Sequence, residues 1–342
     1  MKRHFYTFTY LSTLLILSMA STLTLNAQSD SPLQTGAYMT TFSNPRDMGK
    51  PPPGFFVLWY NYLAFTDTYC DRNGEAFSTL PLNQIDPQLP QVDIAINLST
   101  FATVPALFWA SPFDVLGATW MVGTTPLFST SDASFVTEAR GGPLDSVYRN
   151  VSESRVSGFG DLFVQPLGLF WGLNLFDLGL IYGFTAPTGR YQSGADDNIG
   201  LGFWTHQFQA WGNYYPVSDQ STAITLGLTF ELNGEVKDSP LNPGNRFSME
   251  YGISQYLSDR LELGVQGGHN LQINEDQGED VYWDASVLDK KSTLAFYAGY
   301  WVWDGRMQLG AKYAFDYGCV QRFKTNFLML NLTFLTGLLS GE

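Results

Sequence analysis

Hydrophobic residues at every second position form the dominant pattern along this chain. The clearest run, residues 223–233, carries Ile224, Leu226, Leu228, Phe230 and Leu232 on one parity and Thr225, Gly227, Thr229, Glu231 and Asn233 on the other. Similar runs occupy residues 307–316, 176–185 and 328–334. Because successive side chains of a strand point to opposite faces, this period of two predicts strands with one apolar and one polar face.

Extending the same pattern predicts about twelve strands, each long enough for the 9–11 tilted residues that a bilayer requires. The expected strands are 54–66, 91–104, 112–126, 158–172, 176–187, 199–214, 221–234, 246–256, 260–273, 292–303, 306–317 and 320–334.

The connections between these strands alternate in length. Those after the even-numbered strands are short: 105–111, 172–175, 215–220, 257–259 and 304–305. Those after the odd-numbered strands are long and rich in Asp, Asn, Pro and Gly. This asymmetry is typical of a barrel with short periplasmic turns and long external loops. We expect the longest loop, residues 128–157, to be either mobile or folded over the pore.

Composition supports a membrane protein without membrane helices. Aromatic residues make up 15% of the chain and charged residues only 15%, against about 25% charged residues in soluble domains. The best candidate for a spanning helix, residues 162–184, is interrupted by Gln165, Pro166, Asn174 and Asp177. A closed barrel is the other fold that satisfies its backbone in lipid. The predicted fold class is therefore all-β, a transmembrane antiparallel up-and-down β-barrel.

The first 27 residues have the layout of a secretory signal peptide. A basic start at Lys2 and Arg3 is followed by an apolar run from Phe5 to Met19, and the small Ala27 precedes a polar stretch. We expect cleavage after Ala27, the alternative being an uncleaved membrane anchor. With the barrel pattern, this predicts export to the outer membrane of a Gram-negative bacterium. Removal of residues 1–27 leaves 16 Lys and Arg (18 − 2) against 32 Asp and Glu, so nucleic acid is not an expected partner.

The segment between the signal peptide and the first strand, residues 28–53, ends in three prolines that remove the donors a strand ladder needs. Two interpretations are open for it: a plug inside the lumen or a periplasmic tail. The barrel would then occupy residues 54–334, and residues 335–342 would form a C-terminal tail.

Several blocks carry a family resemblance: residues 51–55 (PPPGF), 158–162 (GFGDL), 165–169 (QPLGL), 186–191 (APTGRY) and 197–207 (DNIGLGFWTHQ). Through them the chain resembles the outer-membrane transporter-like family named for the meta-pathway of phenol degradation, which includes a sphingomyelinase-associated branch. The resemblance implies a monomeric or loosely associated barrel that passes hydrophobic or aromatic small molecules, with no catalytic residues. One departure is that Phe334 is followed by eight further residues, where the family usually ends its last strand with an aromatic or basic residue.

Alternation places a set of polar residues toward the lumen, because a basic side chain facing lipid near the midplane would cost about 2–4 kcal/mol. The set comprises Asp93, Asn97, Asp177, Glu231, Glu250, Glu262, Gln266, Lys312 and Asp316. These residues could form an acidic pore lining that disfavours anions, or an ordinary hydrated and salt-bridged interior.

The two cysteines lie at opposite ends of the barrel sequence, Cys70 just after the first strand and Cys319 near the start of the last. Since the first and last strands of a closed barrel are neighbours, we expect a disulfide across the closure. The alternative is two unpaired thiols. An exported protein permits oxidation.

Little else in the sequence points to catalysis. After removal of the signal peptide only His206 and His269 remain, without a serine motif, so we expect no enzyme, no metal site and no cofactor. The predicted function is passive uptake of apolar or aromatic small molecules, with outer-membrane lipid and the barrel-assembly machinery as further partners. The alternative is a non-transporting barrel that serves in assembly or surface binding through its external loops.

Overall fold

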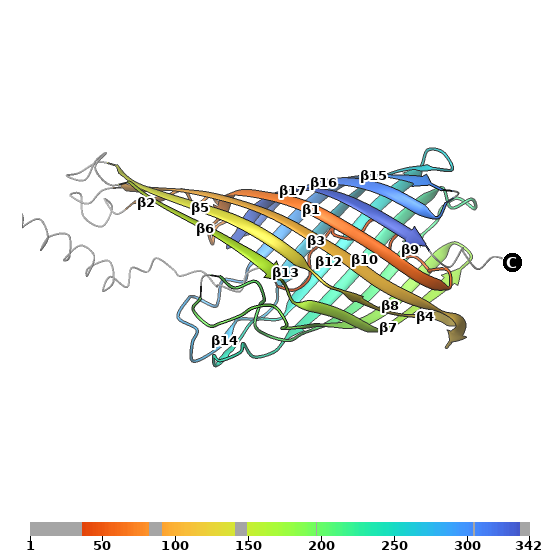
Figure 1. The fold of residues 1–342 in the computed structure, drawn as a ribbon, viewed down its shortest axis with the longest axis horizontal. Helices are drawn as coiled ribbons and strands as arrows, with labels where there is room; N and C mark the ends of the chain where they lie inside the picture. The colour runs from red at the N-terminus through yellow and green to blue at the C-terminus, as the bar shows by residue number, and fades with distance from the viewer. Residues whose placement is uncertain (1–35, 82–90, 141–148, 196, 304, 336–342) are drawn as a thin grey trace, which may run out of the picture.

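The computed structural model describes residues 36–81, 91–140, 149–195, 197–303 and 305–335, and these form a barrel (Figure 1). The strands are β1 (Gly54–Cys70), β2 (Thr79–Pro81), β3 (Gln91–Val115), β4 (Ala118–Thr125), β5 (Phe128–Arg140), β6 (Arg149–Phe159), β7 (Leu162–Leu173), β8 (Phe176–Ala186), β9 (Thr205–Tyr214), β10 (Thr222–Asn233), β11 (Leu241–Asn242), β12 (Arg246–Tyr256), β13 (Leu261–Gln272), β14 (Gln277–Gly278), β15 (Lys290–Val302), β16 (Met307–Val320) and β17 (Arg322–Leu335). Within the described part of the chain, no helix is long and apolar enough to cross a membrane.

The wall of the barrel has twelve strands. β4 and β5 pair with successive parts of β3 and count as one interrupted strand. β7 pairs with β4 and β6 pairs with β5, so β6 and β7 together form the next interrupted strand of the wall. β1 pairs antiparallel with β17 and also with β3, which closes the sheet. The prediction of a closed antiparallel barrel with twelve strands is confirmed.

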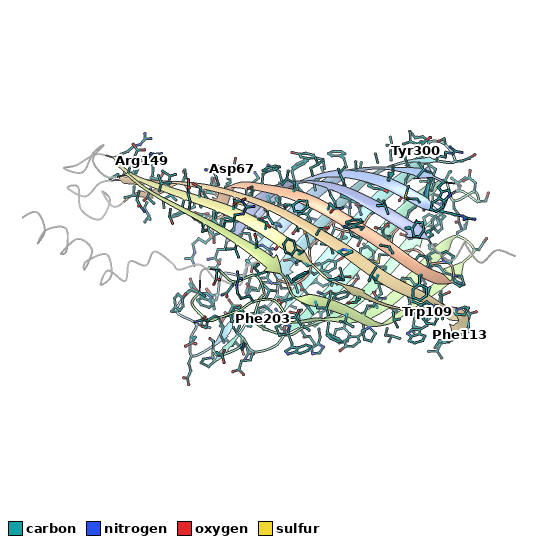
Figure 2. The ribbon with its side chains drawn as sticks, in the orientation of Figure 1. Asp67, Trp109, Phe113, Arg149, Phe203 and Tyr300 are labelled. Atoms are coloured by element: carbon teal, nitrogen blue, oxygen red, sulfur yellow. A yellow bond between two sulfur atoms is a disulfide. The ribbon has the colours of Figure 1, made fainter. Side chains whose placement is uncertain are left out.

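The alternation that predicted the strands sorts their side chains between lipid and lumen. In β10, Thr225, Thr229 and Glu231 are buried inside the barrel, while Leu226 and Ile224 are about half exposed on the outer surface. Exposed apolar side chains of this kind are ordinary on a surface that contacts hydrocarbon. The outer face of the wall carries aromatic clusters near one end of the barrel. One of them joins Trp109 with Trp120 and Phe113, beside the turn between β3 and β4 (Figure 2).

The predicted turn at residues 105–111 is wrong, because these residues lie inside β3. The chain reverses instead at Leu116 and Gly117, both with positive φ. The prolines that suggested a turn are accommodated within the strand. Pro105 stands opposite Trp59, and Pro112 falls in the register shift between Ala110 and Asp114.

The predicted loop at residues 128–157 is also wrong. β5 and β6 form a hairpin that pairs with β3 and projects beyond the barrel, with Arg149 near its tip (Figure 2). The hairpin is rich in Ser and Thr and has no strongly apolar face. Hydrophobic periodicity therefore gave no signal for it.

The strand predicted to begin at residue 199 begins at Thr205, because Asp161 holds the preceding chain in a loop. The Asp161 carboxylate accepts hydrogen bonds from Gly189 N (2.9 Å) and Leu201 N (2.7 Å). The expected signal peptide, residues 28–35 and residues 336–342 lie outside the described residues.

Candidate functional site in the barrel lumen

Residues 36–53, called the luminal segment below, run through the interior of the barrel. Ala37 N donates to Glu231 near the loop end of β10, and the carbonyl of Pro45 accepts a hydrogen bond from Thr225 six residues nearer the turn end. Lys50 N reaches Asp177, two residues after the turn between β7 and β8. The segment therefore crosses the lumen from the loop end to the turn end, where β1 begins.

Two buried glutamates hold the first part of the luminal segment. Glu231 accepts hydrogen bonds from the backbone N–H groups of Ala37 (3.0 Å) and Tyr38 (2.9 Å). Glu250 accepts hydrogen bonds from the Tyr38 hydroxyl and from Thr41 N (2.7 Å). Bonds from an N–H or O–H to a carboxylate are stronger than neutral ones, and they offset part of the cost of burying the charge.

Lys312 fixes the middle of the segment. Its ammonium group donates to the carbonyls of Thr41 (2.7 Å), Phe42 (3.2 Å) and Ser43 (2.7 Å), and the residue is only 1% exposed. An ammonium has three donors, so its capacity is fully used by this one stretch of backbone. Gln266 adds a fourth bond, from Nε2 to the Ser43 carbonyl (3.0 Å).

Arg46 fastens the segment at the turn end of the lumen. Its Nε donates to Ser254 Oγ (2.9 Å) and Glu262 Oε1 (3.1 Å). Its two terminal nitrogens donate to the carbonyls of Gln220 and Ser221. The guanidinium also lies over the ring of Tyr256, 4.5 Å from the centroid, an arrangement that favours cation–π attraction.

Two inward glycines of β13 leave room for the luminal segment. A Cβ placed on Gly268 would lie 2.7 Å from Thr40 Cβ, and one on Gly264 would lie 3.0 Å from Pro45 Cγ. Both share the inward parity of Glu262 and Gln266.

We therefore expect Gly268→Val to push Thr40 away from the wall and loosen the luminal segment, because carbon atoms do not approach this closely. The expected result is a higher single-channel conductance in a planar bilayer. Gly212→Val is the matched control, since its Cβ would point outward and make only a 3.6 Å contact with Leu178. Equal conductance in the two variants would contradict the steric role of Gly268.

A second polar cluster lies at the loop end of the lumen. Arg246 and Arg322 both contact the carboxylate of Asp289 (2.7 and 3.0 Å) and the amide oxygen of Asn270 (3.2 and 2.6 Å), and all four residues are buried. Asp316 is paired with Lys291 at 3.1 Å. Pairing and hydrogen bonding of this kind offset the desolvation cost of burying these charges.

The external loops pack over this end of the barrel. Phe203, Val236, Leu241 and Trp283 form a buried apolar cluster there. Arg72 also forms an ion pair with Asp284 at 2.5 Å. Hydrogen bonds from Ser286, and then from Arg72, lower the pKa of the Asp284 carboxyl below its usual range. The loops are thus tied to one another by apolar and ionic contacts.

Seven of the nine polar residues predicted to face the lumen do so in the structure: Asp177, Glu231, Glu250, Glu262, Gln266, Lys312 and Asp316. Each of the seven contacts either the luminal segment or another polar side chain of the wall.

The prediction was wrong for Asp93 and Asn97. Both lie in the projecting part of β3, on the parity of the outward-facing Phe101 rather than of the buried Ala102. Asn97 is exposed, and Asp93 pairs with Arg140 at 2.6 Å. Beyond the hydrocarbon region a polar side chain can face outward at no cost, so the inward rule does not apply there.

Cys70 and Cys319 are joined by a disulfide, with a Cα–Cα distance of 5.8 Å across 249 positions of sequence. Cys319 lies in β16 rather than at the start of the last strand, and Cys70 is paired in register with Arg322 of β17. The bridge therefore spans the first residue of β17 and ties three strands at the closure of the barrel.

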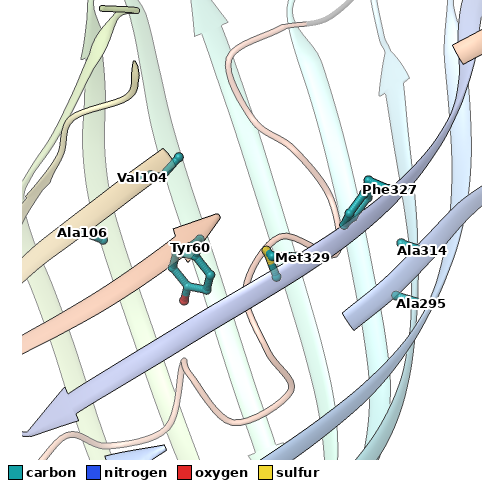
Figure 3. Close-up of a cluster of buried hydrophobic side chains, with 7 residues drawn as sticks. All are labelled: Tyr60, Val104, Ala106, Ala295, Ala314, Phe327 and Met329. Carbon is teal, nitrogen blue, oxygen red and sulfur yellow. The ribbon is translucent and has the colours of Figure 1, made fainter. Parts of the chain in front are cut away.

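An apolar wall faces the polar residues inside the lumen, and sequence reasoning missed it. It consists of Tyr60, Val104, Ala106, Ala295, Ala314, Phe327 and Met329, contributed by β1, β3, β15, β16 and β17 (Figure 3). Met39 and Phe42 of the luminal segment pack against it. The sequence does carry a signal for it, since Phe327 and Met329 share the inward parity of the last strand.

Both histidines among the described residues, His206 and His269, face outward among aromatic side chains. His206 Nδ1 lies 3.0 Å from the Tyr182 hydroxyl, and His269 Nδ1 lies 2.8 Å from Ser292 Oγ. Over the described ranges, no three His, Cys, Asp or Glu side chains are grouped so that they could hold a metal ion.

Comparison with known proteins identifies one family that matches the sequence and several solved structures that resemble the fold. The family described as putative MetA-pathway of phenol degradation matches residues 83–332. The structure is similar to that of an outer membrane channel from Pseudomonas putida, with a TM-score of 0.61 and 16% identity over 85% of this chain and 99% of that one. A FadL homologue from Pseudomonas aeruginosa gives a TM-score of 0.43 at 11% identity, over 86% and 93% of the two chains. A deltaS2 mutant of the TodX monoaromatic hydrocarbon channel gives 0.42 at 10% identity, over 85% and 91%. No curated protein matches the sequence.

Proposed function

Because this chain belongs to the family described as putative MetA-pathway of phenol degradation, we propose that it is a channel for the passive uptake of hydrophobic or aromatic small molecules. It would act in the outer membrane of a Gram-negative bacterium, reached through the signal peptide at residues 1–27. Solutes would be admitted between the external loops, and the luminal segment would form the constriction.

The observation that carries this proposal is the apolar wall inside the lumen. A channel for ions or sugars needs a hydrated lining, whereas Tyr60, Phe327 and Met329 expose apolar surface toward the luminal segment. The segment has no regular secondary structure and is not part of the sheet. It can therefore move without breaking the strand pairing of the barrel.

A second candidate function is a non-transporting barrel that binds partners at the cell surface. It is favoured by the projecting hairpin of β5 and β6, which is paired on one side only among the described residues. Exposed strand edges are a known template for pairing with other chains. The two functions differ in whether solutes cross.

The test measures entry of a fluorescent apolar amine, N-phenylnaphthylamine, into intact cells of a Gram-negative host that produces the barrel. We expect faster entry than in cells without it. Ala295→Phe, which adds bulk to the apolar wall, should reduce the rate. Ala298→Phe is the matched control, because Ala298 has the opposite parity in the same strand and lies outside the lumen.

Folding of both variants is checked by the heat-dependent shift of the barrel on a gel. If the folded wild-type barrel gives no faster entry than the empty host, the uptake function is excluded and surface binding is favoured. Equal rates in the two folded variants would exclude a route along the apolar wall.

A further inference from the structure

We propose that Phe42 occupies a binding site for a monocyclic aromatic molecule in the lumen, and that such a solute binds by displacing the Phe42 ring. This inference deepens the proposed uptake function, on which its biological role rests. The site is formed by Tyr60, Tyr62 and Phe327.

The surroundings of Phe42 are those of an aromatic ligand pocket. Its ring centroid lies 4.7 Å from that of Tyr60, tilted by 52°, and 6.1 Å from that of Tyr62, edge-on at 89°. Tyr62 in turn lies edge-on to Phe327 at 6.4 Å. Tilted and edge-to-face contacts at these distances are the favourable geometries for aromatic pairs. An aromatic solute placed there would make the same contacts.

The floor of the apolar wall is built from small residues. Ala295 and Ala314 are fully buried although they face the lumen, and Ala106 is only 3% exposed. A wall of alanines leaves space that another side chain must fill, because protein interiors are close-packed. Here that space is filled from the luminal segment, by Phe42 and Met39.

The way Phe42 is held allows its ring to leave. All polar contacts of residues 41–43 run through backbone groups: Thr41 N to Glu250, and the three carbonyls to Lys312 and Gln266. The ring itself has only apolar and aromatic contacts. Rotation of this side chain would vacate the site while the backbone stays bound to Lys312.

The size of the vacated space sets the class of ligand. A phenylalanine side chain ends in one six-membered ring, so its departure leaves room for benzene, phenol or a singly substituted relative. An apolar cavity of this size remains dry and binds benzene in other proteins. Tyr60 supplies a polar handle, because its hydroxyl donates to Asp47 Oδ2 at 2.7 Å. That pair could accept or donate a bond to a phenolic hydroxyl.

In the resting state the Phe42 ring competes with the solute. The apparent affinity is then the intrinsic affinity multiplied by the fraction of molecules in which the ring is out of the site. Truncating Phe42 removes the competitor and leaves the rest of the pocket intact. Affinity for a monocyclic aromatic should consequently rise.

The experiment titrates 4-fluorophenol into the purified, detergent-solubilised full chain and follows its fluorine resonance. We expect Phe42→Ala to bind about tenfold more tightly than wild type, with one site per barrel. Phe65→Ala is the matched control, since it removes the same atoms from an outward-facing position of β1. Its binding should equal that of wild type.

A second variant locates the site. Adding Phe327→Ala to Phe42→Ala should abolish the gain, because it removes an aromatic side of the pocket. Phe42→Leu provides a gentler truncation should the alanine variant unfold, and its gain should be smaller but present. An affinity of Phe42→Ala equal to that of Phe65→Ala, or a gain that survives Phe327→Ala, would overturn the proposal. Binding is measured without transport, so failure of the uptake assay alone leaves this inference standing.

Discussion

Lys312→Met should release the luminal segment and raise the conductance of the barrel several-fold. Methionine has nearly the length of lysine but cannot donate hydrogen bonds. The carbonyls of Thr41, Phe42 and Ser43 would lose their shared partner inside a buried site. Ser43 would keep its hydrogen bond from Gln266, but the carbonyls of Thr41 and Phe42 would be left unsatisfied. An unsatisfied buried polar group costs about 1–3 kcal/mol, so these two outweigh the packing of one side chain. The segment would then move to where water satisfies its backbone.

The measurement is single-channel conductance in planar bilayers at fixed salt. Lys324→Met is the matched control, because Lys324 lies exposed on β17 and makes none of these contacts. A conductance of Lys312→Met equal to that of Lys324→Met would show that the lysine does not hold the segment in place. Reduced folding yield would be detected by the gel shift and separated from the conductance of the folded fraction.

Replacing both Cys70 and Cys319 by serine should lower the free energy of unfolding by about 5–6 kcal/mol in the chain-entropy account of disulfides. The bridge closes a loop of 249 residues, nearly the whole wall of the barrel. Without it, the unfolded chain gains the freedom to separate the two ends of the closure. The seam between β1 and β17 would still form through its ladder of backbone hydrogen bonds.

The measurement is the urea or guanidinium midpoint of the barrel in detergent, followed by tryptophan fluorescence. Each single serine variant should match the double variant, because one cysteine alone cannot form the bridge. Both cysteines are buried, 4% and 7% exposed, so a reducing agent should act on wild type only in denaturant. A double variant with the wild-type midpoint would show that the bridge does not restrict the unfolded state.

The sequence predicts the wall of the barrel wherever a strand crosses the membrane. In β10 the hydrocarbon outside requires apolar side chains and the interior requires polar ones. Apolar and polar residues therefore alternate along the strand, and the period of two is visible in the sequence. The hairpin of β5 and β6 lies beyond the membrane, where both faces can be polar, and the pattern disappears. The alternating pattern therefore ends where the strands leave the bilayer.

The site was only half predictable for a related reason. Alternation places Glu231, Glu250 and Lys312 inside the barrel, but it does not show what they bind. Residues 36–53 have no period, so the sequence alone does not distinguish a plug from a tail. The structure places them between the polar residues and the apolar wall. Long-range contacts of this kind depend on the closed cylinder and have no local signature.

The course of the luminal segment has a consequence for how the molecule is built. Ala37 lies near one mouth of the cylinder, and Gly54, where the first strand starts, lies at the other. Threading the segment into a finished cylinder would carry the backbone of residues 37–43 along the lumen, its polar groups unsatisfied, before Glu231, Glu250 and Lys312 could bind it. Placing it before β17 joins β1 avoids that barrier. We therefore expect the sheet to form around the luminal segment, and the pairing of β1 with β17 to enclose it last.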